Sequence, residues 1–167
     1  MRKIAIVGAE CTGKSVLTEA LAMAYNCPFV PEFAREYLGK LKQPYTALDV
    51  QAIARGQLSL EDEAVASAEA PYLFCDTNLW VIKVWMDNSY KTTPEWIERE
   101  IQQRSYHLHI VTDYDIPYET DSLREHPNQR AHFTDIYRNL LDANHVPYIY
   151  VQGGLQERVK QVITSLQ

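Results

Sequence analysis

Cysteine is scarce in this sequence of 167 residues, and its scarcity excludes two kinds of site. The three cysteines, Cys11, Cys27 and Cys75, are odd in number and lack the spacing of metal ligands. The sequence therefore predicts neither a disulfide framework nor a zinc site. Free thiols are typical of a reducing compartment, so we expect a cytoplasmic protein in which Cys27 and Cys75 are small buried hydrophobic residues.

Long apolar runs are also missing, since no stretch approaches the ~20 apolar residues of a membrane span. Arg2 and Lys3 precede an apolar segment, residues 4–7, as they would in a signal peptide. This segment is too short for that purpose, and Glu10 and Lys14 follow it closely. We expect neither a signal peptide nor a membrane partner.

An excess of positive charge is the third absence. The chain has 16 lysines and arginines against 22 acidic residues, which gives a formal net charge of −6. A surface that coats nucleic acid needs a basic excess, so we expect no nucleic-acid partner. This charge remains compatible with a local basic pocket for a small phosphate ligand.

The composition that is present is that of a globular protein, with 46% hydrophobic and 23% charged residues. The length suits one domain, residues 1–167, with a sizeable core. The chain contains no repeat, low-complexity tract or linker. Strand-like and helix-like segments alternate, which predicts an α/β fold with a five-stranded parallel sheet and helices on both faces.

The expected elements follow from hydrophobic spacing and from start and stop signals. Buried strands are expected at residues 4–7, 28–31, 71–75, 106–111 and 147–151. Helices are expected at residues 13–25, 46–69, 133–141 and 155–166. Thr46 should cap the second of these helices, and Thr93 should cap a further one that has Pro94 at its first position. The polar residues 113–129 should form a loop.

One motif carries the chemistry. Residues 8–15, GAECTGKS, match the pattern G-x-x-x-x-G-K-[ST] directly after a buried strand and at the start of a helix. Gly8 and Gly13 allow the backbone to curl so that its N–H groups face the phosphates of ATP or GTP, and the helix adds its positive end. Lys14 should reach the β- and γ-phosphates, and Ser15 should ligate Mg²⁺. The alternative is a glycine-containing turn with a solvated lysine.

Asp76 supports the motif, because it directly follows the third buried strand. The carboxyl ends of parallel strands line the ligand crevice in such sheets. A carboxylate there can hold the magnesium shell through water or take a proton from an acceptor hydroxyl. Alternatively, Asp76 is the N-cap of the helical segment that follows.

Two further clusters favour a kinase. Glu32 and Arg35 follow the second strand, where an acceptor hydroxyl would lie, although they could instead form a surface salt bridge. The loop at about residues 113–130 carries Arg124 and Arg130, which could close as a lid over the γ-phosphate. Arg124 could instead pair with Glu125 or Asp121, and Arg130 could simply begin the next helix.

Aromatic residues are plentiful, and Trp80, Trp85 and Tyr90 follow Asp76 closely. One of them could stack on a flat ring of the substrate, although core packing is the more common role of a single aromatic residue. His107 and His109 alternate on an expected strand without a third metal ligand, which favours a structural role.

These motifs together resemble the ribosylnicotinamide kinase domain of NadR-type proteins, a family of AAA-like P-loop ATPases and kinases. The resemblance rests on the loop at residues 8–15, the segment PEFAREY at residues 31–37, the strand end FCDT at residues 74–77, and DIPYE at residues 115–119 with Arg124. It covers nearly the whole chain and keeps the motif order.

The resemblance implies that nicotinamide riboside is phosphorylated at its 5′-hydroxyl by ATP with Mg²⁺ in NAD salvage. It also implies a nucleoside-kinase-like fold with a lid, and by analogy an adenine site near Gly153 and Gly154. The chain should lack the DNA-binding and adenylyltransferase domains of NadR-type proteins.

The predicted site has four parts. The nucleotide-binding set is Gly8, Glu10, Cys11, Thr12, Gly13, Lys14, Ser15, Val16 and Arg130. The catalytic set is Lys14, Glu32, Asp76 and Arg124, the substrate-binding set is Glu32, Arg35, Asp76 and Trp85, and the metal set is Ser15 and Asp76. Two alternatives stay open at this point: another nucleoside or nucleoside-monophosphate kinase, and a nucleotide-dependent regulatory switch.

Overall fold

The computed structural model describes residues 1–119 and 128–167. Its sheet is formed by β1 (Arg2–Val7), β2 (Phe29–Val30), β3 (Tyr72–Asp76), β4 (Leu108–Thr112) and β5 (Tyr148–Val151). The strands lie in the order β2-β3-β1-β4-β5, and every neighbouring pair is parallel. The helices are α1 (Lys14–Tyr25), α2 (Phe33–Lys40), α3 (Ala47–Ser67), α4 (Leu79–Tyr90), α5 (Glu95–Gln103), α6 (Arg130–Ala143) and α7 (Leu155–Leu166).

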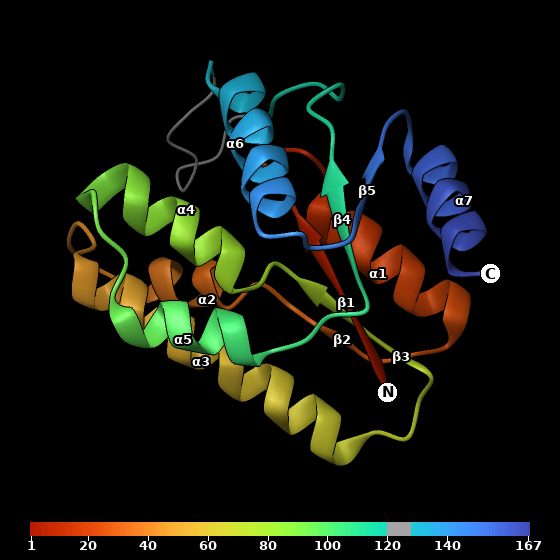
Figure 1. Cartoon of the computed structure of the whole chain (residues 1–167), viewed down its shortest axis with the longest axis horizontal. Coiled ribbons are helices and arrows are strands. Elements are labelled where there is room, and N and C mark those ends of the chain that lie inside the picture. The colour runs from red at the N-terminus through yellow and green to blue at the C-terminus, as the bar shows by residue number, and fades with distance from the viewer. Residues whose placement is uncertain (120–127) are drawn as a thin grey trace.

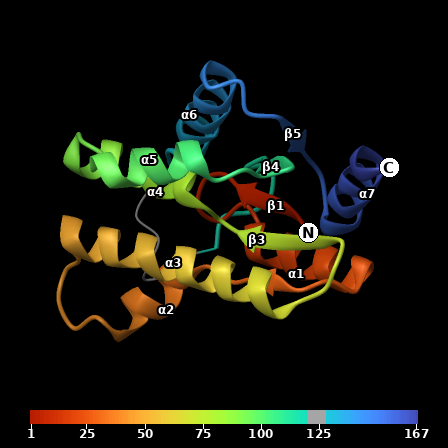
Figure 2. The same ribbon diagram turned by 60° about the horizontal axis from the view of Figure 1, so that its bottom comes forward.

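Helices cover both faces of the sheet, as predicted (Figures 1 and 2). Side chains alternate along β1, so that Ile4 and Ile6 face α1 and α7 while Ala5 and Val7 face α3, α4 and α6. All four side chains are fully buried. A strand buried on both faces is a continuous apolar run, which is why residues 4–7 could be predicted as a strand.

Of the two predicted helix caps, the cap of α3 is confirmed and the cap of α5 is wrong. Thr46 caps α3 in a capping box with Asp49, as expected. The predicted start of α5 is wrong by one position, because the helix begins at Glu95, and Pro94, not Thr93, occupies the N-cap position. The Pro94 carbonyl accepts the first hydrogen bond of the helix, from the Ile97 N–H. The Thr93 hydroxyl donates instead to Asp87 Oδ1 of α4 at 2.8 Å, so it does not face the first turn of α5.

Other boundaries shift by a few residues. β4 begins at Leu108 rather than at Tyr106, and the Tyr106 hydroxyl donates to the buried carboxylate of Glu61. Cys75 is buried in β3, as expected, whereas Cys27 is only half-buried in the turn after α1. No helix among residues 1–119 and 128–167 has the length and apolar character needed to cross a membrane.

Candidate functional site

The turn between β1 and α1 has the backbone that a phosphate-binding loop requires. Gly8 has φ 145°, and a Cβ at this position would lie 2.5 Å from Thr112 Oγ1 of β4. Gly13, with φ 79°, directly precedes α1. In the described part of the chain no side chain caps the start of α1, so its first N–H groups are available to an anion. The strand, loop and helix that the motif predicts are therefore present.

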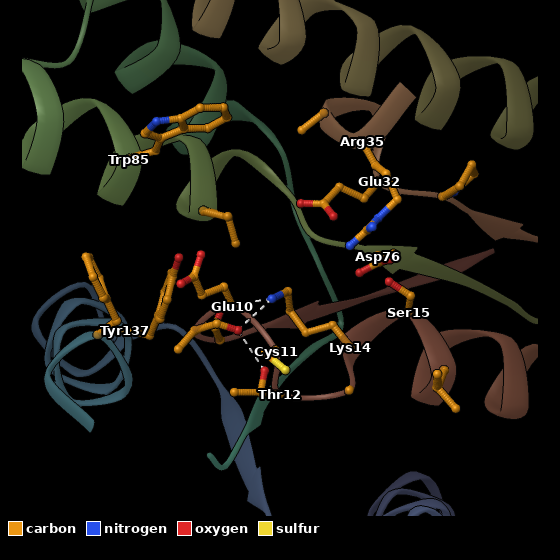
Figure 3. A pocket seen from close by; sticks show the side chains of 18 of the residues that line it. Glu10, Cys11, Thr12, Lys14, Ser15, Glu32, Arg35, Asp76, Trp85 and Tyr137 are labelled. Atoms are coloured by element: carbon orange, nitrogen blue, oxygen red, sulfur yellow. Dashed lines mark hydrogen bonds between the residues drawn. The ribbon is translucent and has the colours of Figure 1, made fainter. Parts of the chain in front are cut away.

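Lys14 lies across the inside of this loop (Figure 3). Its ammonium group donates to the carbonyls of Ala9 at 2.7 Å and Gly8 at 3.1 Å. The Thr12 hydroxyl donates to the Ala9 carbonyl at 2.8 Å and lies 2.7 Å from Thr112 Oγ1, which fixes the loop to β4. The loop thus holds a positive charge at its mouth in a rigid frame.

Asp76 is the buried carboxylate of the site. It ends β3, pairs in register with Ile6 of β1, and is 3% exposed. Burial, followed by the nearby charge of Glu32, raises its pKa from the ordinary 3.8 to about 6, against the opposing effects of Lys14, Ser15 and Arg35. Its Oδ1 has no hydrogen-bond partner among the described residues.

The alternative role of Asp76 as a helix cap is wrong. Asn78 caps α4 by accepting a hydrogen bond from the Trp80 N–H at 3.0 Å. Between the two residues, Thr77 has φ 72°, a left-handed conformation that is costly for a β-branched residue. This turn separates the cap from the carboxylate and leaves Asp76 directed into the site (Figure 3).

Ser15 and Asp76 suit a magnesium ion that is shared with phosphates. The Ser15 hydroxyl lies beside the Asp76 carboxylate and lowers its pKa, so the two side-chain oxygens lie close together next to the loop (Figure 3). The described residues contain no cluster of three or more His, Cys, Asp or Glu side chains that could hold a metal by themselves. Mg²⁺ does not require such a cluster, because it commonly takes one or two protein oxygens and completes its shell with phosphate and water.

Glu32 and Arg35 lie close above Asp76 (Figure 3), and their charges act on its carboxylate in opposite directions. Glu32 occupies the N-cap position of α2, and Arg35 lies in the first turn of this helix. Gln57 of α3, which is 2% exposed, holds the turn by accepting from the Phe33 N–H at 2.9 Å and donating to the Pro31 carbonyl at 3.3 Å. The sequence pattern contained no signal for this role of Gln57.

One cavity of about 820 Å³ joins these groups. Its size is within the range of small-molecule sites. The predicted residues that line it are Gly8, Glu10, Cys11, Thr12, Gly13, Lys14, Ser15, Val16, Glu32, Arg35, Asp76 and Trp85. The phosphate loop forms one end, and aromatic side chains form much of the other (Figure 3).

The aromatic end combines rings from three segments. Trp85 of α4 donates from Nε1 to the Tyr45 hydroxyl at 3.1 Å, and the two rings meet edge to face at 5.0 Å. Tyr137 and Phe133 of α6 line the cavity from the facing side. Burial, and after it the charges of Glu32 and Glu10, raise the pKa of Tyr137 well above its ordinary value. Tyr45 and Tyr137 were missed at the sequence level.

The other aromatic candidates lie elsewhere. Trp80 is buried in the core, and Tyr90 packs half-buried against it. Of the three candidates after Asp76, the cavity therefore contains Trp85 alone among the described residues. His109 is buried with Nε2 3.0 Å from Asn78 Nδ2, and burial lowers its pKa to about 4, which fits a structural role.

Arg130 begins α6, as one of the two alternatives predicted. It lies behind the phosphate loop and does not line the cavity, because its Nη1 donates to the carbonyls of Ile116 at 2.8 Å and Cys11 at 3.2 Å. Arg124, with Asp121 and Glu125, lies outside the described residues, so the lid function stays a prediction.

Arg158 is a residue of this region that sequence analysis missed. It donates to the Thr12 carbonyl of the phosphate loop and to Gly153. Gly153 and Gly154, where the adenine is expected, form the turn before α7 and do not line the cavity. The adenine position therefore stays a prediction.

Known proteins similar to this chain were identified at the family, sequence and structure levels. A family model described as an AAA domain matches residues 3–158. The trifunctional NAD biosynthesis/regulator proteins NadR of Salmonella typhimurium and Escherichia coli are each 25% identical over 158 residues, covering 91% of this chain and 38% of each relative. The chain thus spans little more than a third of the length of these relatives.

Solved structures of NadR proteins and of a nucleoside kinase have the same fold as this chain. A NadR protein in complex with NR (nicotinamide riboside) has a TM-score of 0.83 and 22% identity over 99% of this chain and 50% of that chain. NadR in complex with NAD and AMP-PNP gives a TM-score of 0.77 and 21% identity over 99% and 48%. Deoxyadenosine kinase from M. mycoides gives 0.69 and 13% over 98% of both chains. The resemblance to NadR-type proteins and the kinase-like P-loop fold are thereby confirmed.

Proposed function

We propose that this chain, which belongs to the AAA domain family, is an ATP- and Mg²⁺-dependent kinase that acts on nicotinamide riboside in the cytoplasm. The reaction transfers the γ-phosphoryl group of ATP to the 5′-hydroxyl of the riboside and yields ADP and nicotinamide mononucleotide. The observation that carries the proposal is a single cavity with a phosphate loop at one end and an acidic, aromatic pocket at the other.

The acceptor end suits a flat ring that carries positive charge. Aromatic faces and edges are offered by Trp85, Tyr45 and Tyr137, and the same cavity is lined by Glu10 and Glu32, whose negative charges act on Tyr137. The nicotinamide ring of the riboside is a pyridinium cation, so it gains both cation–π attraction and charge attraction in such a pocket. Glu10 belongs to the phosphate loop, where a carboxylate opposes triphosphate binding, and a cationic acceptor offsets this repulsion.

The donor end supplies positive charge and donors for ATP. The Lys14 ammonium group would leave the loop carbonyls and bind β- and γ-phosphate oxygens of ATP. Ser15 would ligate Mg²⁺ beside them, and Asp76 would hold the shell of this ion through water. When bound, the magnesium ion would neutralise charge that develops on the transferred phosphoryl group. Phosphoryl transfer then depends chiefly on positioning, which the rigid attachment of the loop to β4 provides.

Asp76 is the group best placed to orient the acceptor hydroxyl and take its proton. A pKa of about 6 keeps it largely ionised at neutral pH and still basic enough to accept a proton. Glu32, close to Asp76, would bind the ribose hydroxyl groups, and Arg35 would balance the charge of the two carboxylates (Figure 3). The relative that was solved with NR supports this choice of acceptor.

A nucleoside panel tests the proposal. ADP release should be strongly stimulated by nicotinamide riboside and weakly by uridine, adenosine or deoxyadenosine, which are neutral at pH 7.5. Glu10→Gln should raise the KM for nicotinamide riboside by about 5-fold, since it removes one attractive charge near the ring, and should leave the KM for ATP equal or lower.

Strong turnover of a neutral nucleoside with none of nicotinamide riboside would replace this substrate by another nucleoside. The absence of turnover with every acceptor, together with nucleotide-dependent capture of a protein, would favour the regulatory switch instead. An equal effect of Glu10→Gln on cationic and neutral acceptors would contradict the charge argument.

A further inference from the structure

Arg158 is the most extensively bonded buried cation behind the phosphate loop. It lies in the first turns of α7 and is 2% exposed. Its guanidinium donates to three backbone carbonyls: Thr12 at 2.5 Å, Gly153 at 2.8 Å and Asp113 at 3.1 Å. It also forms an ion pair with Asp115. Arg158 does not line the cavity, so its role must be exerted through these groups.

The contact with Thr12 has a geometric consequence for the ligand. In a trans peptide the C=O and the following N–H point in opposite directions. The guanidinium holds the Thr12 carbonyl toward the back of the loop, so the Gly13 N–H of the same peptide points toward the phosphate side. Arg130 holds the preceding carbonyl, that of Cys11, and thereby directs the Thr12 N–H in the same way.

Asp115 fixes the guanidinium in this position. One of its carboxylate oxygens pairs with Arg158, and the other accepts a hydrogen bond from the Gly153 N–H at 2.6 Å. The arginine, the aspartate and the glycine turn therefore form one closed set of contacts behind the loop. A planar guanidinium with five donors can satisfy several acceptors at once, which a lysine ammonium on a flexible stem cannot reproduce.

We propose that Arg158 is a positioning residue for the nucleotide phosphates. It sets the orientation of the Thr12–Gly13 peptide from behind the loop, without touching the ligand. The contribution is made before ATP arrives, so binding requires no reorganisation of this peptide. The inference concerns the nucleotide alone and does not depend on the identity of the acceptor.

The test compares Arg158→Met with Arg104→Met as a matched control. Arg104 is also a largely buried arginine in an ion-pair network, with Asp62 and Glu100, but it lies away from the cavity. Calorimetry should measure the binding of ATP and of inorganic tripolyphosphate at a temperature where both variants are folded. We expect about 10-fold weaker binding of both ligands to Arg158→Met, because a charge-assisted hydrogen bond to the loop is lost. The control should stay within about 2-fold of the parent.

Arg158→Lys keeps the charge and should weaken tripolyphosphate binding by about 3-fold, since one ammonium group cannot hold all three carbonyls. This variant decides the question if Arg158→Met does not fold. Tripolyphosphate binding to a folded Arg158 variant that is as tight as binding to the Arg104 control would overturn the proposal. So would an equal weakening of adenosine and tripolyphosphate, since this would indicate general loosening of the fold.

Discussion

Asp76 is a residue whose buried charge opposes stability at neutral pH. Its carboxylate is buried near the carboxylate of Glu32, and its pKa is raised to about 6. Between about pH 4 and pH 6 the folded protein therefore holds a proton that the unfolded chain has released. The folded state is favoured by this group at low pH, and the advantage is lost as the pH rises through 6.

Asp76→Asn is therefore expected to stabilise the protein at pH 8 and to abolish its turnover. A pKa raised from 3.8 to about 6 corresponds to about 3 kcal/mol, so the free energy of unfolding should rise by about 2–3 kcal/mol at pH 8 and little at pH 4. Urea unfolding at the two pH values measures this difference. Turnover should fall by at least about 100-fold if the carboxylate takes the proton.

Asp76 of the ligand-free parent protein becomes protonated as the pH is lowered through about 6. Mg²⁺ beside the carboxylate lowers this pKa, so turnover should decline at a pH below 6. A stability gain of Asp76→Asn that is equal at pH 4 and pH 8 would contradict the assignment of the raised pKa to this residue. Asp87→Asn offers a control, because this carboxylate is half-exposed and pairs with Lys83 on the surface of α4.

The residues that could be predicted are those whose role depends on neighbours in the sequence. The phosphate loop is one short segment between β1 and α1, and it contains Gly8, Gly13, Lys14 and Ser15. Asp76 is the last residue of β3, so its position follows from where that strand ends. Residues that reach the site only through partners distant in the sequence could not be predicted from the sequence around them. These are Tyr45, Tyr137 and Arg158.

At the scale of elements, the start of the short helix α2 carries Glu32 and Arg35, which line the side of the cavity where we propose that the acceptor binds. It has eight residues and buries only Ala34, so its position depends on its contact with α3. That contact is close, since a Cβ at Gly56 would lie 2.2 Å from the ring of Phe33. Gln57 adds two hydrogen bonds to the turn that presents Glu32.

Gln57→Leu should therefore damage the acceptor side more than the nucleotide side. It leaves the Phe33 N–H and the Pro31 carbonyl without partners, and we expect a loss of about 2 kcal/mol of stability. Steady-state kinetics should give a several-fold higher KM for the acceptor and a nearly unchanged KM for ATP. Gln57→Glu retains the acceptor oxygen for Phe33 and should have a smaller effect; a larger rise in the KM for ATP than for the acceptor would contradict this role of α2.

Elements were predictable to different degrees for a physical reason. β1, β3 and the long helix α3 have continuous apolar patterns or strong caps, and their positions were predicted closely. α2 has a mixed pattern and few buried residues, and it was not predicted as a helix. Its helical state is stabilised by docking on α3, which is a tertiary effect that a sequence window does not contain.

At the scale of the molecule, the order of the strands brings the parts of the site together. β1 lies between β3 and β4, so the phosphate loop meets Asp76 on one side and Thr112 on the other. β2 lies beyond β3 (Figure 1). Glu32 follows β2 in the chain, so it comes to the edge of the sheet at which the parallel strands end. The parallel class was predictable from the alternation of elements, whereas this strand order was not.

Because a ligand that binds only the folded chain stabilises it, and the site is formed by several elements, ATP should stabilise the whole protein. At a concentration of 100 times its Kd, a ligand adds about 2.7 kcal/mol, which corresponds to a rise in Tm of about 5–10 °C for a chain of this size. Lys14→Ala should remove most of this rise, and Lys160→Ala, at an exposed position of α7, should retain it. A rise in Tm with Lys14→Ala equal to that of the parent would contradict the assignment of the phosphate loop.

The two hydrogen bonds from Lys14 to the carbonyls of Gly8 and Ala9 bear on which nucleotides are retained. When a phosphate binds the Lys14 ammonium group, the hydrogen bonds to these two carbonyls are lost. The net free energy of the phosphate contact is therefore smaller than that of a new hydrogen bond to a free ammonium group. Only a ligand whose phosphate chain reaches the ammonium gains from the exchange. AMP would have to bind without that gain, so ATP can displace a monophosphate that competes for the same loop.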